Sequence, residues 1–235
     1  MTREPGDLPA SGRSCLGPGD GRGTVLPSER RTSGGGRIDN AVLALSDVVW
    51  TSDEVGARDR LTIQDGFLTA YPAWVMSSWV SDDPGHRDRF PVSLGYRFAV
   101  AMAGVLGIGS DLLAWSDAEL AEAADRVARY RGLRSVIQRG SVRTHGRPDR
   151  DLYALEYLGP DDDPRVVILV YDRDRDRVRD QSAPRVFPSG LRPGVVYRVA
   201  GSEQLVTAET ARRAGIVVPF NWAPDADVLV LESLG

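Results

Sequence analysis

The stretch DVVWTSD, residues 47–53, decides the fold. It joins a strand candidate, Asp47–Trp50, to a carboxylate, and Ala57–Leu68 behind it reads as a helix. The same alternation then recurs along the chain. Thr69–Val80 is expected to contain a second strand, and Leu94–Leu106, which is apolar and rich in Ala and Gly, is expected to be a buried helix. Alternating strands and helices predict a β/α architecture.

The clearest single element is a helix predicted over residues 117–139. Ser116 and Glu119 have the spacing of a capping box, in which each residue bonds the backbone of the other. Gly140 supplies the stop signal at the other end. Ile108–Leu113, just before this helix, is expected to be a short strand or a turn. The apolar face of the helix is predicted to contain Leu120, Ala123, Ala124, Val127, Tyr130 and Ile137.

The sequence period changes after residue 141. Short apolar runs separated by Gly, Pro and Asp now indicate strands joined by turns. The expected strands are Leu152–Leu158, Arg165–Tyr171, Val195–Ala200 and Asp227–Glu232. Strand–helix units followed by a strand-only tail predict an α/β protein, with part of a β/α architecture and then a small antiparallel β-sandwich.

The composition of the 235 residues argues against several classes of protein. The formal net charge of −4 argues against a nucleic-acid binder, and no stretch approaches 18 apolar residues, so no membrane-spanning helix is expected. Met1–Ala10 lacks the apolar core of a signal peptide. Cys15 is the single cysteine, and no Cys/His cluster is present to hold zinc. We therefore expect a cytoplasmic protein without a metal site.

Residues 1–30 differ from the rest of the chain. They are rich in Gly and Pro and poor in apolar residues, so they cannot bury enough surface to offset their chain entropy. We expect a disordered or non-native leader, and a frameshift or a wrong start would produce such a segment. All 29 basic residues are arginine, which is typical of a GC-rich coding sequence. Comparison of the coding DNA in all three frames tests the hypothesis.

A glycine-rich motif, Ser33-Gly34-Gly35-Gly36-Arg37, is the first candidate for chemistry. Three consecutive glycines let a backbone approach a ligand closely and permit positive φ angles. A flexible linker or turn is the alternative interpretation. A nucleotide phosphate loop is disfavoured, because neither the Walker spacing nor G-x-G-x-x-G is present.

The second candidate is the acid of Trp50-Thr51-Ser52-Asp53. A carboxylate just past an apolar strand lies where barrel enzymes keep their catalytic groups. A neighbouring Trp can desolvate such an acid and raise its pKa, as suits a general acid near neutral pH. The alternative is that Ser52 or Asp53 caps the helix that follows. Local sequence does not separate the two interpretations.

Together the two motifs resemble the bacterial α-galactosidases of glycoside hydrolase family 36. That family has a Cys-x-Ser-Gly-Gly-Gly-Arg segment followed by Trp-Thr-Ser-Asp. This chain has residues 33–39, SGGGRID, then Trp50–Asp53, then residues 60–64, RLTIQ. The resemblance implies that residues 31–140 are the C-terminal half of a (β/α)₈ TIM barrel. It also implies that residues 141–235 are the C-terminal β-sandwich domain of these enzymes.

The resemblance also implies roles for individual residues. Asp53 takes the position of the general acid/base, and Ser33, Gly34 and Gly35 take positions in the galactose pocket. Trp50 is either a lining residue of that pocket or a structural anchor. The implied substrate is an α-galactoside oligosaccharide such as melibiose or raffinose, cleaved without a metal or organic cofactor. Full-length family members are often homo-oligomers, although no interface can be read from this sequence.

The chain departs from the family pattern in two places. Arg31 stands where the family has a cysteine, which puts the shape of the sugar pocket in doubt. The family's nucleophile is an Asp in a Lys-x-Asp-x-Asn segment upstream of the glycines, and Met1–Thr32 contains no such segment. A closed barrel typically takes about 250 residues. We therefore expect a truncated chain that lacks the nucleophile, is poorly soluble alone and is inactive by itself.

Two other functions stay open at this point. A non-catalytic sugar-binding remnant would keep the glycine segment and the β-sandwich without the chemistry. A raffinose-type galactosyltransferase would keep the barrel and change the acceptor. A nucleophile motif in an upstream reading frame or a partner chain would favour an enzyme over a remnant, and these residues do not separate transfer from hydrolysis.

Overall fold

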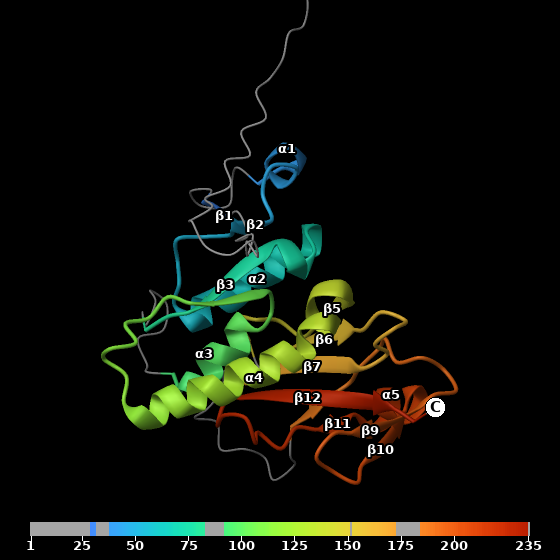
Figure 1. Cartoon of the computed structure of the whole chain (residues 1–235). Helices are drawn as coiled ribbons and strands as arrows, with labels where there is room; N and C mark the ends of the chain where they lie inside the picture. The colour runs from blue at the N-terminus through green and yellow to red at the C-terminus, as the bar shows by residue number, and fades with distance from the viewer. Residues whose placement is uncertain (1–28, 32–37, 83–91, 151, 173–183, 235) are drawn as a thin grey trace, which may run out of the picture.

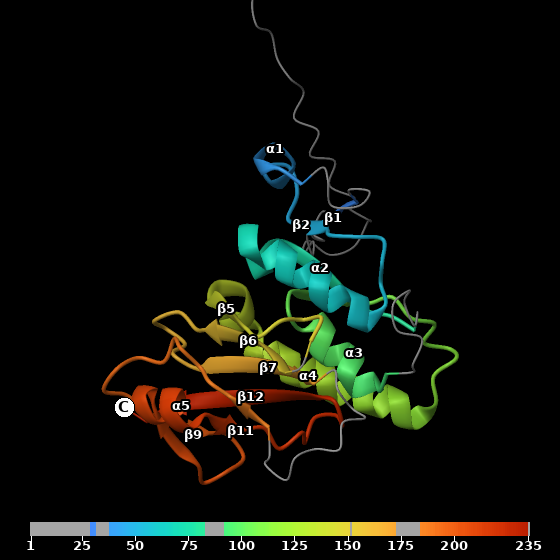
Figure 2. The same cartoon turned by 180° about the vertical axis from the view of Figure 1, so that it is seen from behind.

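The structure, a computed structural model, describes residues 29–31, 38–82, 92–150, 152–172 and 184–234 (Figures 1 and 2). Its first part alternates strands and helices up to one long helix. The elements are β1 (Glu29–Arg31), α1 (Asn40–Leu43), β2 (Val48–Trp50), α2 (Ala57–Ala70), the 3₁₀ turn η2 (Ala73–Val75), β3 (Met76–Val80), α3 (Leu94–Ala101), β4 (Val105–Ile108) and α4 (Asp117–Arg139).

The first four strands form one parallel sheet in the order β1-β2-β3-β4. Each strand pairs with the next strand in the sequence, and a helix lies between successive strands. This sequential order is that of a (β/α) barrel, whereas a doubly wound sheet reverses its strand order at a switch point. The described sheet therefore has the topology of consecutive barrel units.

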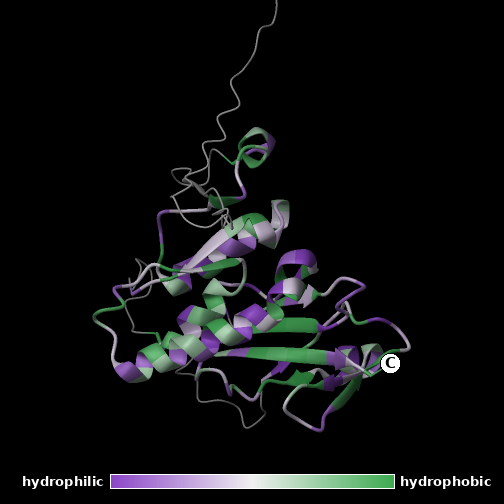
Figure 3. Cartoon of the chain, in the orientation of Figure 1, coloured by the Kyte–Doolittle hydropathy of each residue, from purple (hydrophilic) through white to green (hydrophobic). Residues whose placement is uncertain are grey.

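The second part of the chain is mostly antiparallel. Its elements are β5 (Ser141–His145), β6 (Leu152–Leu158), β7 (Val166–Asp172), β8 (Arg185–Val186), β9 (Val196–Val199), β10 (Leu205–Thr207), α5 (Ala208–Ala214), β11 (Ile216–Val217) and β12 (Ala226–Ser233). Six of these strands form one sheet in the order β10-β9-β12-β7-β6-β5, and β8 pairs with β11 in a small separate sheet. The long central strands of the larger sheet are apolar along most of their length (Figure 3).

The helices α3 and α4 lie between the two main sheets (Figure 1). One core cluster joins side chains of both parts, among them Val100 and Val136 from the helices and Tyr157 and Tyr171 from the six-stranded sheet. Alternate residues of the same strands point to the opposite face of the sheet, where they pack with α5, β8 and β11 in a second cluster. The six-stranded sheet is thus covered on both faces.

Tyrosine hydroxyls of the second part hold the end of α3. Tyr171 donates to the carbonyl of Ala99 at 2.9 Å, and Tyr157 donates to the carbonyl of Ala103 at 2.7 Å. The last carbonyls of a helix have no partner within the helix. These buried bonds supply partners from the neighbouring sheet and fix how α3 sits on it.

Most of the predicted elements are present. The helix predicted at 117–139 is α4, and its capping box between Ser116 and Glu119 is formed. The expected strands within 47–50 and 69–80 are β2 and β3, and the predicted helix at 57–68 is α2, extended to Ala70. The four strands expected after residue 141 are β6, β7, β9 and β12, with small shifts at their ends.

The helix predicted over Leu94–Leu106 is wrong in its second half. The helix α3 ends at Ala101, and Val105–Ile108 is the strand β4. Gly104 explains the change, because a Cβ there would lie 2.4 Å from the carbonyl oxygen of Met76 on β3. The backbone must come this close to β3 before β4 can pair with it. Of the strand or turn expected at Ile108–Leu113, Ile108 is the last residue of β4 and the remaining residues form a turn that follows it.

Other differences come from polar segments. The tail is not strand-only, because α5 follows β10 and is capped by Thr207 and Thr210 in place of the usual Glu or Gln. Leu120, predicted on the buried face of α4, is 39% exposed, and Leu133 and Val136 are buried instead. No strand was expected at β1, which overlaps the end of the predicted leader. Residues 1–28 of that leader lie outside the described residues.

Candidate active site

Three parallel strands end at one edge of the first sheet, called the carboxyl edge below. An acid follows each of them closely: Asp53 after β2, Asp82 after β3 and Asp111 after β4. Because the pairing is parallel and in register, these three strand ends lie side by side. In barrel enzymes the catalytic groups lie at this edge. The fold therefore places Asp53 just past β2, at the carboxyl edge.

The turn that carries Asp53 is held by its neighbours. The Ser52 hydroxyl accepts from the Glu54 amide at 3.1 Å, and the Glu54 carboxylate accepts from the Gly56 amide at 2.7 Å. The N-cap of α2 is Gly56, and no side chain caps the helix. The interpretation of Ser52 or Asp53 as a helix cap is therefore wrong. Asp53 is exposed.

Trp50 is a buried member of an aromatic pair at the carboxyl edge. Its ring lies 4.5 Å from the ring of Trp79, centroid to centroid, and the two planes are tilted by 52°. Two glycines make room for Trp79, because a Cβ at Gly107 or Gly109 would lie within 2.7 or 2.5 Å of its indole. The strands β2, β3 and β4 together shape this aromatic layer.

A buried arginine lies beside the same pair. Arg60, in the first turn of α2, is 1% exposed, and its guanidinium carbon lies 5.2 Å from the centre of the Trp50 ring. Its Nη2 donates to the carbonyl of Ser77 at 3.0 Å, and its Nη1 lies 3.5 Å from the carbonyl oxygen of Ser52. Burial lowers the pKa of Arg60 to about 10, and the charge of Glu54 acts in the opposite direction. The group stays cationic at neutral pH.

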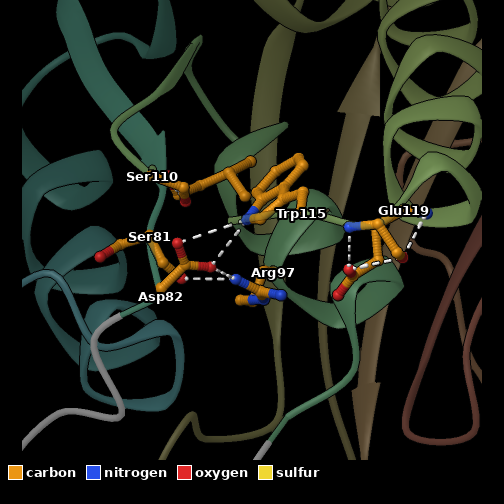
Figure 4. A network of polar contacts seen from close by, with 8 residues as sticks. Ser81, Asp82, Arg97, Ser110, Trp115 and Glu119 are labelled. Carbon is orange, nitrogen blue, oxygen red and sulfur yellow. Dashed lines mark hydrogen bonds and ion pairs between the residues drawn. The ribbon is translucent and has the colours of Figure 1, made fainter. Parts of the chain in front are cut away.

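Asp82 anchors a polar network between the loops after β3 and β4 (Figure 4). Its carboxylate pairs with Arg97 of α3 and accepts from the indole of Trp115 at 3.3 Å. Arg97 also donates to the carbonyl of Ser81 at 3.2 Å, and Ser110 donates to that of Val80 at 3.2 Å. These bonds tie the two loops to each other and to α3.

Sequence reasoning did not find this network. Asp82 carried a usable signal, because it follows a strand as closely as Asp53 does. Arg97 and Trp115 carried none, since they are 15 and 33 positions from Asp82 and only the fold brings them together.

The structure describes two of the predicted site residues, Asp53 and Trp50. Ser33, Gly34 and Gly35 lie outside the described residues. The strand before them is described, however: β1 runs parallel to β2, with the backbone of Arg31 in register with that of Trp50. In the sequence, the glycine-rich motif thus follows β1, and Asp53 follows the neighbouring strand β2.

Within the described residues, no group of three or more His, Cys, Asp or Glu side chains is arranged to hold a metal ion. No helix in this part of the chain is both long and apolar enough to cross a membrane.

Comparison with known proteins identifies the family. Residues 24–140, which include the whole carboxyl edge, match the melibiase family. The chain belongs to the melibiase family. A probable α-galactosidase C from Aspergillus terreus (strain NIH 2624 / FGSC A1156) is 32% identical over 203 residues, which cover 86% of this chain and 27% of that relative. The predicted resemblance to family-36 α-galactosidases is confirmed.

Solved structures of this family share the fold. The galactosidase domain of the α-galactosidase–sucrose kinase AgaSK matches with a TM-score of 0.77 and 27% identity, over 86% of this chain and 28% of that one. Two variants of the family-36 α-galactosidase AgaA from Geobacillus stearothermophilus, in complexes with raffinose and stachyose, match with TM-scores of 0.75 and 0.74 and identities of 25% and 26%. They are covered to 28% each, with 88% and 86% of this chain aligned. This melibiase-family chain thus spans about a quarter of the length of the relatives it matches.

Proposed function

We propose that this chain supplies the acid/base side of a retaining α-galactosidase site, with Asp53 as the general acid/base. Asp53 would protonate the leaving oxygen of a terminal α-galactosyl group and then take a proton from the attacking water. The observation that carries the proposal is the parallel register of Arg31 with Trp50. It brings the strand ends before the glycine segment and before Asp53 together at the carboxyl edge, in the family's order.

The substrate class follows from the relatives. The curated relatives are named α-galactosidases, and the AgaA variants hold raffinose and stachyose. We therefore propose an oligosaccharide with a terminal α-galactosyl residue, such as melibiose or raffinose, as the substrate.

The local geometry supports the role of Asp53. An acid that exchanges protons with both a leaving group and water needs access to both, and Asp53 is exposed. Asp53 does not cap α2, because the N-cap of this helix is Gly56. Trp50 is buried against Trp79 and Arg60, which favours a role as structural anchor over one as a lining of the sugar pocket.

A retaining mechanism needs a second carboxylate, about 5–5.5 Å from the first. In the family this nucleophile lies in a Lys-x-Asp-x-Asn segment, and the 235 residues contain no lysine. We therefore propose that the 235-residue chain by itself does not hydrolyse an aryl α-galactoside. Turnover by the purified chain that disappears in Asp53→Asn would contradict this.

A hybrid enzyme tests the role of Asp53 directly. In AgaA the segment aligned with this chain is replaced by this chain, and hydrolysis of p-nitrophenyl α-galactoside is measured. We expect an active hybrid in which Asp53→Asn lowers kcat by about 10²–10⁴-fold. The loss in kcat/KM, which reports the first step, should be smaller for a dinitrophenyl galactoside, whose leaving group needs less protonation. Asp111→Asn, after β4 at the same edge of the sheet and two strands away from β2, is the matched control. Full activity of the Asp53→Asn hybrid would refute the role.

The missing lysine motif favours one second candidate, a sugar-binding protein without catalysis. The distinguishing result is binding of raffinose by the 235-residue chain together with an inactive hybrid. Calorimetric titration with raffinose, with sucrose as the control that lacks the galactosyl group, measures the binding.

A further inference from the structure

A buried cation lies directly behind the turn that carries Asp53. Arg60 is 1% exposed, and moving a charged group out of water is costly unless it is paired or hydrogen-bonded. Its guanidinium contacts two backbone carbonyls and an aromatic ring, and Glu54 is the charge that acts on it most. These contacts offset the cost of burial and fix the side chain next to the turn.

The two carbonyls belong to the turn after β2 and to the neighbouring strand β3. Ser52 directly precedes Asp53 after β2, and Ser77 lies within β3, in register with Trp50. A guanidinium is planar and carries several N–H donors in a fixed fork, so one side chain spans both acceptors. A lysine ammonium in the same place is a compact point charge and does not reproduce the fork.

We propose that Arg60 is a positioning residue for Asp53. It links the carbonyl of Ser52 to β3 and packs on Trp50. The residues that directly precede Asp53 are thereby held against the sheet. This inference rests on the proposed function for its catalytic meaning. Its structural content, a turn held in place by Arg60, is measured without any activity.

Arg126 on α4 provides a matched control. It donates to the carbonyl of Trp222 at 2.8 Å, lies 4.0 Å from the centre of the Trp222 ring and pairs with Glu122 at 2.9 Å. It thus combines a carbonyl, a tryptophan ring and a glutamate as Arg60 does. Its partners belong to α4 and to the second part of the chain, away from Asp53.

The test measures backbone order in the full 235-residue chain by NMR relaxation. In the wild type we expect N–H order parameters of about 0.85 at Ser52, Asp53 and Glu54, the value of a rigid backbone. In Arg60→Lys they should fall below about 0.6, whereas Val136 in α4 keeps its value. Arg126→Lys should leave residues 52–54 unchanged. If Arg60→Lys does not fold, Arg60→Gln, which keeps a planar donor for one carbonyl, takes its place.

Two results would overturn the proposal: unchanged order at residues 52–54 in the Arg60 variant, or an equal fall in Arg126→Lys. A second measurement addresses the proposed function separately. In the AgaA hybrid, Arg60→Lys should lower kcat at least fivefold and Arg126→Lys less than twofold. If the order parameters change as expected while Asp53→Asn leaves the hybrid fully active, the positioning role stands and the proposed function fails.

Discussion

Glu156 of β6 is fully buried, yet both of its oxygens are used. Oε2 lies 2.7 Å from His145 Nε2 and accepts from the Ser189 amide at 3.0 Å, while Oε1 accepts from the Gly190 amide at 3.0 Å. Burial raises the pKa of Glu156, but His145 and the two amides outweigh it, so the pKa lies below its usual 4.5. One carboxylate thereby joins β5, β6 and the loop before β9.

Replacing Glu156 by Gln should make stability less dependent on pH. A lowered folded-state pKa stabilises the protein above the unfolded-state value of about 4.5, and this stabilisation is lost as the pH falls through the folded-state pKa. We expect Glu156→Gln to lower the unfolding free energy by about 2 kcal/mol at pH 7. Urea titrations from pH 7 to pH 3 should show the gap to the wild type shrinking below about pH 4.5.

The control for this substitution is Glu232→Gln. Glu232 pairs with Arg198 on the surface at 2.8 Å, and exposed pairs contribute little. If the difference in unfolding free energy between the wild type and Glu156→Gln were the same at pH 3 and pH 7, the assignment of Glu156 as an ionised buried acid would be contradicted.

Gly107 is required by the tryptophan layer. A Cβ there would lie 2.7 Å from Trp79 Cδ1, and moving the Trp79 ring would disturb its contact with Trp50. We expect Gly107→Ala to lower the melting temperature and to change the near-UV circular dichroism of the tryptophans. Gly66→Ala, in the exposed middle of α2 with no neighbour within 4 Å, should instead raise stability by about 0.5–1 kcal/mol. Equal effects at the two glycines would refute this account.

At the scale of elements, α3 depends on the sheet beneath it. Tyr171 is fully buried, and its hydroxyl bonds the carbonyl of Ala99 in the last turn of α3. Tyr171→Phe keeps the ring and leaves that carbonyl without its partner. We expect a loss of about 1–1.5 kcal/mol in unfolding free energy, measured by urea titration at constant m-value. The Tyr71 hydroxyl bonds the carbonyl of Ile38 at a partly buried site, so Tyr71→Phe should cost less unfolding free energy than Tyr171→Phe. A larger loss for Tyr71→Phe would count against the role of the Tyr171 bond in holding α3.

The elements that sequence predicted well are those with a local signal. The helix α4 has a capping box at Ser116 and Glu119, and the central strands β6 and β7 are short apolar runs bounded by turn residues. The strand β4 was predicted as part of a helix because the run Leu94–Leu106 is apolar and rich in Ala and Gly. The close approach of Gly104 to Met76 ends the helix instead. That approach is a tertiary constraint with no local signature.

The same distinction applies to the candidate site. Asp53 was found because it directly follows a strand in an ordered motif, and its role as acid/base stays a prediction. Asp82 was missed although it follows a strand as Asp53 does, and its partner Arg97 had no sequence signal. Arg60 was missed because its importance comes from Ser77, which only the fold brings near. Strand ends could be located from sequence, whereas the groups that support them could not.

At the scale of the whole molecule, the two sheets share the helices between them. The largest core cluster contains Val49 and Met76 of the first sheet, Val136 of α4, and Tyr157 and Leu169 of the second sheet. The sequence predicted separate domains that meet near residue 140. A core that runs continuously across that boundary implies that the first part is not stable without the second.

Residues 1–140 expressed alone should therefore fail to form a cooperative fold. Cutting after Gly140 would expose the faces of α3 and α4 that pack on β6, β7 and β12 and would remove the hydroxyls that hold the end of α3. We expect binding of a hydrophobic dye and no cooperative thermal transition, compared with the full chain under the same conditions. Co-expression with residues 141–235 should restore the transition, since the shared core can then form between the two pieces. A sharp transition for residues 1–140 alone would mean that the carboxyl edge is held by the first sheet and its own helices.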